Sequence, residues 1–138
     1  MTRGRLWVAE EFPQIEALLD LYGIGPYSAL LIVAELGEVE RFGDARQVGA
    51  YAGLTPQVHQ SGEHAWHGPI TKQGSRWLRW ILVQAAIKLV RRDARLAAFY
   101  QRVRKRRGRN VARVAVARKL AGISWVRLRR WQREQAAA

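Results

Sequence analysis

Apolar residues recur at helical spacing along most of the chain, and this regularity constrains the fold more than any other feature of the sequence. Ile15, Leu18, Leu19 and Tyr22 form a first apolar stripe that ends at Gly23. Later stripes keep the interval of three or four residues that places side chains on one face of a helix. This spacing predicts a mainly α fold, with helices over residues 15–22, 26–37, 44–52, 78–92, 93–109 and 110–128.

Short polar residues and a glycine mark the expected ends of several helices. Asp44, Asp93 and Asn110 each precede an apolar stripe, and Asp and Asn side chains at such positions accept hydrogen bonds from the first N–H groups of a helix. Gln47 stands three residues after Asp44 and completes a capping box. Gly53 follows this short helix, where it can provide a C-terminal stop.

The helical period is lost over residues 54–70. Thr55 and Pro56 interrupt it, and Ser61 with Gly62 can form a turn between two stretches that are able to extend. We therefore expect a short β-hairpin or an extended loop inserted into a helical bundle. The 138 residues predict one domain over 14–131, with 1–13 as a lead-in and 132–138 as a frayed tail.

Charge divides the chain into two unlike halves. Residues 1–60 hold 4 Lys/Arg against 8 Asp/Glu, whereas residues 61–138 hold 20 against 3. The basic second half should attract polyanions, and nucleic acid is the commonest polyanion in a cell. A ribosome-like scaffold or a membrane-surface helix would also be basic. The absence of cysteine excludes a thiolate zinc site and a thiol nucleophile. No uncharged run is long enough to span a bilayer, and we expect a cytoplasmic, nucleoid-associated protein without membrane contact.

One run of cations is the strongest signal of nucleic-acid binding. Each cation that neutralises a phosphate releases counterions and adds affinity, although cations at a helix C-terminus also favour the helix dipole. Five tryptophans, Trp66, Trp77, Trp80, Trp125 and Trp131, could stack on bases, but their helical spacing favours places in the core. The predicted phosphate contacts in this run are Arg102, Arg104, Lys105, Arg106, Arg107 and Arg109.

The segment from Gly23 to Pro26 resembles a helix-hairpin-helix motif. In that motif, glycines such as Gly23 and Gly25 let a sugar-phosphate backbone approach the start of a helix. An ordinary helical hairpin is the alternative, because Pro26 removes one donor and no cation lies between Leu6 and Glu40.

The polar side chains of the inserted segment offer a nucleophile and no recognisable metal site. His59, His64 and His67 match the spacing of no closed zinc site, which favours loop histidines and no metal in this chain. Ser61 fits a turn. As a nucleophile toward a phosphodiester it would also need cations to hold the phosphate, and Lys72, Arg76 and Arg79 follow it at the start of the next helix.

Seven short stretches occur in a specific order between about residue 14 and residue 130: 23–29 (GIGPYSA), 34–37 (AELG), 51–56 (YAGLTP), 60–62 (QSG), 68–74 (GPITKQG), 78–79 (LR) and 116–120 (VARKL). Together they resemble the C-terminal domain of the bacterial insertion-sequence transposases that are guided by a bridge RNA and carry a serine nucleophile. The resemblance implies that Ser61 joins covalently to DNA during strand exchange. It also implies that Lys72, Arg76 and Arg79 lie near the transferred phosphate or the guide RNA.

Two departures from the family pattern shape the functional prediction. Members carry an N-terminal RuvC-like domain with a divalent-metal site, and we expect this chain to act without one of its own. Residues 63–67 (EHAWH) replace a stretch that is rich in glycine and cations. We therefore expect a DNA-binding, catalytic-serine domain of a transposase that is inactive alone. Its partners would be DNA, a guide RNA, and either further copies of itself or a separate RuvC-like domain. A non-catalytic nucleic-acid-binding module, a truncated remnant and an RNA-binding scaffold are the alternatives.

Overall fold

The computed structural model describes residues 10–54 and 68–138, with side chains from residue 76 onward in the second range. In this part of the chain the fold consists of five α-helices and two short 3-10 helices, without a strand, which confirms the mainly α prediction. The elements are η1 (Pro13–Ala17), α2 (Pro26–Leu36), η2 (Val39–Arg41), α3 (Ala45–Tyr51), α5 (Gly68–Leu89), α6 (Ala94–Arg107) and α7 (Arg109–Ala137).

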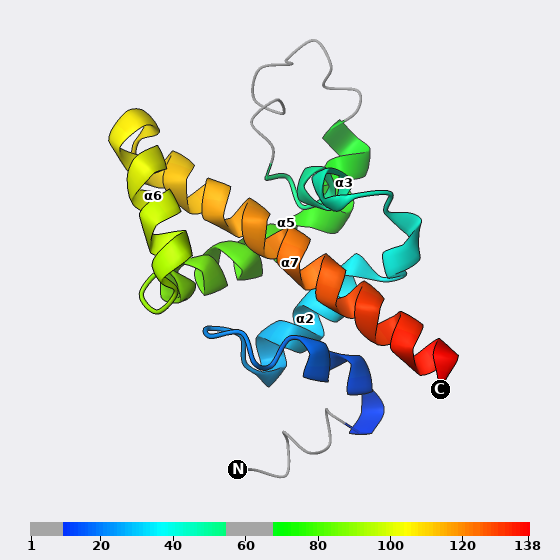
Figure 1. Ribbon diagram of the computed structural model, residues 1–138. Coiled ribbons are helices and arrows are strands. Elements are labelled where there is room, and N and C mark those ends of the chain that lie inside the picture. The colour runs from blue at the N-terminus through cyan, green and yellow to red at the C-terminus, as the bar shows by residue number, and fades with distance from the viewer. Residues whose placement is uncertain (1–9, 55–67) are drawn as a thin grey trace.

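The long helix α7 organises the domain. It crosses the face nearest the viewer in Figure 1 and packs against α6, α5, α3 and η1, while α2 packs against α5 behind it. Val116, Leu120 and Leu128 of α7 are buried with Leu78 and Leu82 of α5. α7 continues to Ala137, so most of the tail that we expected to fray is helical. No helix in the described ranges has the length and apolar character needed to cross a bilayer.

Two close contacts fix elements of the first half of the chain on α7. A Cβ atom built on Gly122 would lie 3.1 Å from the Cβ of Ala45, so the glycine allows α3 to approach α7. Trp125 is buried, and its Nε1–H donates to the carbonyl oxygen of Val39 at 2.8 Å. This hydrogen bond satisfies the indole inside the core and ties η2 to α7.

The expected helix over 15–22 is wrong in type, and only Ile15 and Leu18 of its apolar stripe are buried. Successive hydrogen bonds link the N–H groups of Leu18, Leu21 and Ile24 to the carbonyl oxygens three residues earlier. That spacing is the 3-10 repeat, and only Pro13–Ala17 forms a 3-10 helix before the chain continues in turns. Ile15 and Leu18 are buried as the stripe predicted, because residues three apart share a face in either helix. Leu19 is half-buried and Tyr22 is 46% exposed, so the second half of the stripe is not in the core.

Most of the predicted helix ends are confirmed. Asp44 accepts a hydrogen bond from the N–H of Gln47, and Asp93 accepts one from the N–H of Leu96. The side chain of Gln47 accepts from the N–H of Gly43, one residue before the position that a capping box requires. Gly53 has a positive φ of 72° just after α3, which confirms it as the stop.

The predicted cap at Asn110 is wrong. Gly108, with φ of 96°, both ends α6 and begins α7: its N–H donates to the carbonyl oxygen of Arg104, and its own carbonyl oxygen accepts from the N–H of Ala112. Asn110 therefore lies within the first turn of α7. The left-handed conformation available to glycine makes the reversal without a side-chain cap.

The two glycines of the expected hairpin have different roles. Gly23 has φ of 91°, and a Cβ there would lie 3.1 Å from both the carbonyl oxygen of Ala85 and the Cβ of Lys88. Gly25 is the N-cap of α2 with φ of −93°, and nothing lies within 4 Å of a Cβ built on it. Only Gly23 is demanded by the fold, where it lets the chain before α2 approach the end of α5.

The predicted β-hairpin lies mostly outside the described residues. Its last part is described and is helical, because α5 begins at Gly68 and includes Ile70. Pro69 falls in the first turn of α5, where a missing N–H costs little. Helix α5 therefore begins earlier than the loss of apolar period predicted.

Candidate nucleic-acid interface

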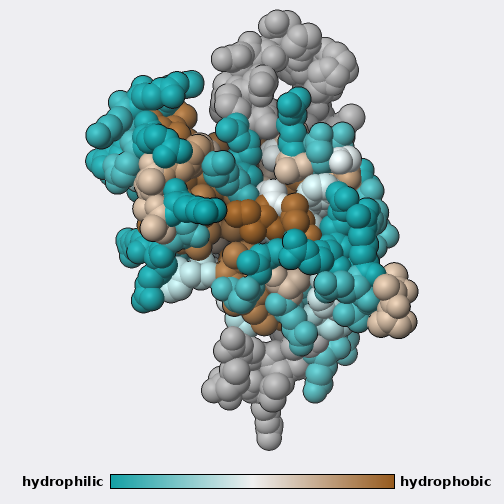
Figure 2. Space-filling model, viewed as in Figure 1, coloured by the Kyte–Doolittle hydropathy of each residue, from teal (hydrophilic) through white to brown (hydrophobic). Residues whose placement is uncertain are grey.

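A broad groove with a volume of about 1340 Å³ runs along one side of α7. Figure 2 shows an apolar area in the middle of the face that α7 crosses, with hydrophilic residues around it. Phe99 of α6 and Gly122, Ile123 and Val126 of α7 contribute the apolar lining of the groove. The cationic lining comes from Arg46 of α3 and from Arg118, Lys119, Arg127 and Arg130 of α7.

Helical spacing explains why α7 presents these cations together. Lys119, Ile123, Val126 and Arg130 recur every three or four residues, so they form one stripe that is separate from the buried stripe of the same helix. Arg46 reaches the groove because the small residues Ala45 and Gly122 let α3 lie against α7. The groove therefore joins cations that are far apart in the sequence.

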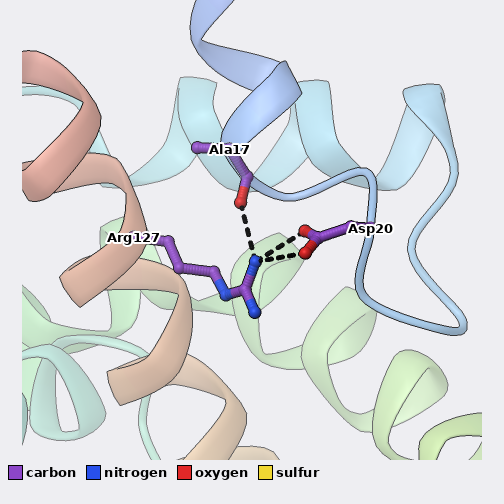
Figure 3. A network of polar contacts seen from close by, with 3 residues as sticks. All are labelled: Ala17, Asp20 and Arg127. Atoms are coloured by element: carbon purple, nitrogen blue, oxygen red, sulfur yellow. Dashed lines mark hydrogen bonds and ion pairs between the residues drawn. The ribbon is translucent and has the colours of Figure 1, made fainter.

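One of the five cations is already engaged by a carboxylate (Figure 3). Arg127 Nη1 lies 2.6 Å from Asp20 Oδ1 and 2.8 Å from Oδ2, and 3.5 Å from the carbonyl oxygen of Ala17. The hydrogen bond from Arg127 lowers the pKa of Asp20 below its ordinary value. Arg127 therefore fixes the segment after η1 on α7, and among the described residues Asp20 is the only carboxylate that lines the groove.

The other four groove cations form no ion pair within the described residues. Lys119 Nζ lies 4.5 Å from the centre of the Phe99 ring, and the guanidinium carbon of Arg102 lies 5.7 Å from the same centre. Phe99 thus holds one cation of α7 and one of α6 on its ring. The ring connects the groove to the basic end of α6.

The predicted run of cations occupies the turn between α6 and α7. Arg102, Arg104, Lys105, Arg106 and Arg107 lie on the last turns of α6 and Arg109 begins α7, and all six are exposed. Residues 94–133 contain neither Asp nor Glu. Phosphates reaching this surface would meet no carboxylate of α6 or of the first six turns of α7.

A second basic surface lies on α5. Arg76 and Arg79 are exposed, as predicted for cations outside the apolar stripe, and Trp77 and Trp80 are exposed beside them. The expected core position is therefore wrong for Trp77 and Trp80, whereas it is confirmed for Trp125. Trp131 is half-buried, and Trp66 is outside the described residues.

The predicted nucleophile and several of its neighbours also lie outside the described residues. These are Ser61 and the three histidines, His59, His64 and His67; Lys72 belongs to α5, but its side chain is not among those described. Gly23 and Gly25 lie in the turn before α2, and neither lines the groove. The proximity of Ser61 to Lys72, Arg76 or Arg79 stays a prediction.

Sequence reasoning missed the cations of the groove itself. Arg118 and Lys119 belong to the stretch 116–120 that carried the family resemblance, and their places between the apolar Val116 and Leu120 were a signal that could have been used. Arg46, Arg127 and Arg130 carried no such signal. Their grouping depends on the packing of α3 and of the segment after η1 against α7.

Comparison with known proteins identifies one family. A family model described as "Transposase IS116/IS110/IS902 family" matches residues 15–101. A "Probable family 20 transposase" of Pseudomonas aeruginosa is 38% identical over 122 residues, which are 85% of this chain and 36% of the relative. The "Transposase for insertion sequence element IS1111A" of Coxiella burnetii is 31% identical over 135 residues, 95% of this chain and 37% of the relative.

A third relative extends the same pattern. The "Transposase for insertion sequence element IS1328" of Yersinia enterocolitica is 35% identical over 115 residues, which are 80% of this chain and 34% of the relative. The chain therefore spans about a third of the length of these curated relatives. No solved structure gives a significant match.

Proposed function

This chain belongs to the IS116/IS110/IS902 family of transposases, and from that premise we propose that it is a nucleic-acid-binding domain carrying the serine nucleophile of DNA transposition. The single observation that carries the binding part is the carboxylate-poor basic surface of α6 and α7. It combines a groove lined by five cations with the six exposed cations at the turn between these helices. DNA is the proposed substrate, and a guide RNA is a proposed partner.

The groove would bind the sugar-phosphate backbone. Arg46, Arg118, Lys119 and Arg130 have no carboxylate partner in the described ranges, so their charge is available to phosphates. Contacts of this kind position a nucleic acid without reading its sequence. Binding should therefore depend steeply on salt and weakly on base sequence.

The catalytic part of the proposal rests on the family resemblance and on chemistry. The Ser61 Oγ would attack the phosphorus of a DNA phosphodiester, forming a serine–phosphate ester while a DNA hydroxyl leaves and a base accepts the Oγ proton. Attack on that ester by a DNA hydroxyl would then release the serine and join the strands. Arg76 and Arg79 are exposed on the helix that follows Ser61, and they would stabilise the negative charge that develops on the phosphate.

Partners would complete the site. The divalent-metal chemistry of the family would come from a RuvC-like domain outside residues 1–138, and the proposed protein partners are that domain or further copies of this chain. The contribution of this chain would be the serine, the cations near it and the grip on the nucleic acid. Alone, the chain should bind nucleic acid and transfer no strand.

Salt titration of nucleic-acid affinity tests the binding proposal. Lys119→Gln with Arg130→Gln removes two exposed groove cations, and Lys88→Gln with Arg91→Gln removes two exposed cations outside the groove. For duplex DNA the groove variant should flatten the slope of log affinity against log salt by about 1.8, since each phosphate contact adds about 0.9. The control should change the slope little. Equal slopes for the wild type and the groove variant would remove the groove from the interface.

Trapping of a covalent adduct tests the nucleophile. Supplied with a RuvC-like domain of the family, guide RNA and donor DNA, the chain should form a serine-linked DNA adduct that survives denaturation. Ser61→Ala should abolish the adduct and keep the affinity for DNA, whereas Ser28→Ala, a serine on α2, should leave both unchanged. An adduct that persists in Ser61→Ala would refute the assignment. DNA binding without any adduct would favour the non-catalytic module instead.

A further inference from the structure

Two tryptophans stand out on the exposed side of α5. Trp77 is 56% exposed and Trp80 is 47% exposed, although large aromatic side chains usually bury most of their surface. Leu78 and Leu82 are buried on the opposite side of the helix, where they complete the core. The exposed pair is therefore not needed to close the core at this end of α5.

The two indole rings support each other and still offer free surface. Their centres are 6.4 Å apart and their planes meet at 88°, an edge-to-face arrangement. In such a pair the ring that presents its edge keeps both of its faces, and the other ring keeps one. The pair is thus held in place while flat aromatic faces remain for a ligand.

The positive charge around the two tryptophans indicates which class of ligand this surface would bind. Arg76 is exposed four residues before Trp80 and three before the exposed Arg79, and residues three or four apart are neighbours on a helix, so Arg76 lies beside both. The whole of α5 contains no Asp or Glu. A ligand for this surface should combine flat rings with negative charge, which is the composition of an unpaired nucleotide strand.

We infer that Trp77 and Trp80 form a stacking platform for unpaired bases, while Arg76 and Arg79 hold the phosphates of the same strand. This inference rests on the proposed nucleic-acid-binding function and adds a second kind of contact to it. The cationic groove grips backbones whether or not their bases are paired. The platform on α5 engages bases only where they are unpaired, because the rings of a duplex are stacked on one another and closed to it.

Binding of three nucleic acids to the full chain tests the platform. These are an oligothymidine, a strand of equal length with abasic residues, and a duplex. Trp77→Leu with Trp80→Leu should weaken binding to oligothymidine by about tenfold, the scale of base–aromatic stacking, and leave the abasic strand and the duplex unchanged. Trp77→Phe with Trp80→Phe should retain most of the affinity, because it keeps aromatic rings at both positions.

Tyr27→Leu is the matched control, since Tyr27 is a 68% exposed aromatic residue on α2. It should change no affinity, and an unchanged melting temperature in each variant verifies the fold. Oligothymidine binding that is equal in the wild type and the leucine variant overturns the platform while the proposed function stands. An equal loss for all three nucleic acids, or a loss of self-association instead of binding, also overturns it. A wild type that binds none of the three overturns the proposed function itself.

Discussion

Three glycine-to-alanine substitutions separate backbone strain from steric clash in this fold. At Gly25, φ is −93° and a new Cβ meets nothing within 4 Å; at Gly108, φ is 96° and the space is again open. At Gly23, φ is 91° and the new Cβ would also lie 3.1 Å from a carbonyl oxygen of α5. Each step of this series adds one unfavourable term to the free energy of folding.

The expected losses of unfolding free energy follow from these terms. Gly25→Ala should stay within about 0.5 kcal/mol of the wild type, because the reduced entropy of the unfolded chain offsets the poorer N-cap. Gly108→Ala should lose about 1–3 kcal/mol for a residue held at positive φ. Gly23→Ala should lose about 1–3 kcal/mol more than Gly108→Ala, because the carbonyl oxygen of Ala85 belongs to a helix backbone and cannot move aside cheaply.

Urea and thermal unfolding measure the series. At about 3 °C per kcal/mol for a domain of this size, the step from Gly108→Ala to Gly23→Ala should be resolved in the melting temperature. The affinity for duplex DNA below the transition should be the same in Gly23→Ala and the wild type, because Gly23 does not line the groove. Equal stability of Gly23→Ala and Gly25→Ala would refute the steric reasoning. Lost affinity with unchanged melting would restore the DNA-contact role of the hairpin.

Two further predictions concern contacts between the first half of the chain and α7. Asp20→Asn should cost at most about 1 kcal/mol at pH 7, since the Arg127 pair is exposed. The hydrogen bond from Arg127 lowers the pKa of Asp20 in the folded state. The stabilisation is therefore present above the unfolded pKa of 3.8 and is lost as pH falls through the folded pKa. If the wild type is still more stable than Asp20→Asn in urea unfolding at pH 2, this reasoning is contradicted. Trp125→Phe should cost about 2–4 kcal/mol, because it leaves a small cavity and a buried Val39 carbonyl oxygen without its donor. Trp131→Phe is the control, because Trp131 is half-buried. If both variants lose the same unfolding free energy in denaturant, the hydrogen bond of Trp125 does not contribute as expected.

The sequence predicted which residues are buried better than it predicted what surrounds them. Leu78, Leu82 and Leu128 lie on the apolar stripes of the predicted helices and are buried, because a helical repeat in the sequence becomes a face in space. The same repeat misled at Trp77 and Trp80, which are three residues apart but lie out of phase with the leucines of α5. The interval between apolar residues identifies a helix, and only their phase relative to the core identifies the buried ones.

Sequence patterns predicted helix caps correctly where both partners lie within a few residues, but they did not predict contacts between separate elements. Asp44 and Asp93 cap their helices because their partners lie three residues away. Gly23 is required by α5, which lies far along the chain, and Gly25 by nothing nearby, so no local pattern could distinguish them. Ser61 lies outside the described residues, and its role rests on the resemblance and on the adduct experiment.

The packing of the chain determines which of its unevenly distributed charges are paired and which remain available. Two carboxylates of the acidic first half pair with the C-terminal part of α7: Asp20 with Arg127, and Glu40 with Arg133. These pairs engage cations that hold the fold together, and they lie along α7 beyond Val126. The earlier turns of α7 and the end of α6 meet no carboxylate in the described ranges. Folding therefore concentrates the available positive charge on the side of the domain where Phe99 joins the groove to the basic end of α6, which is where a phosphate backbone would be held.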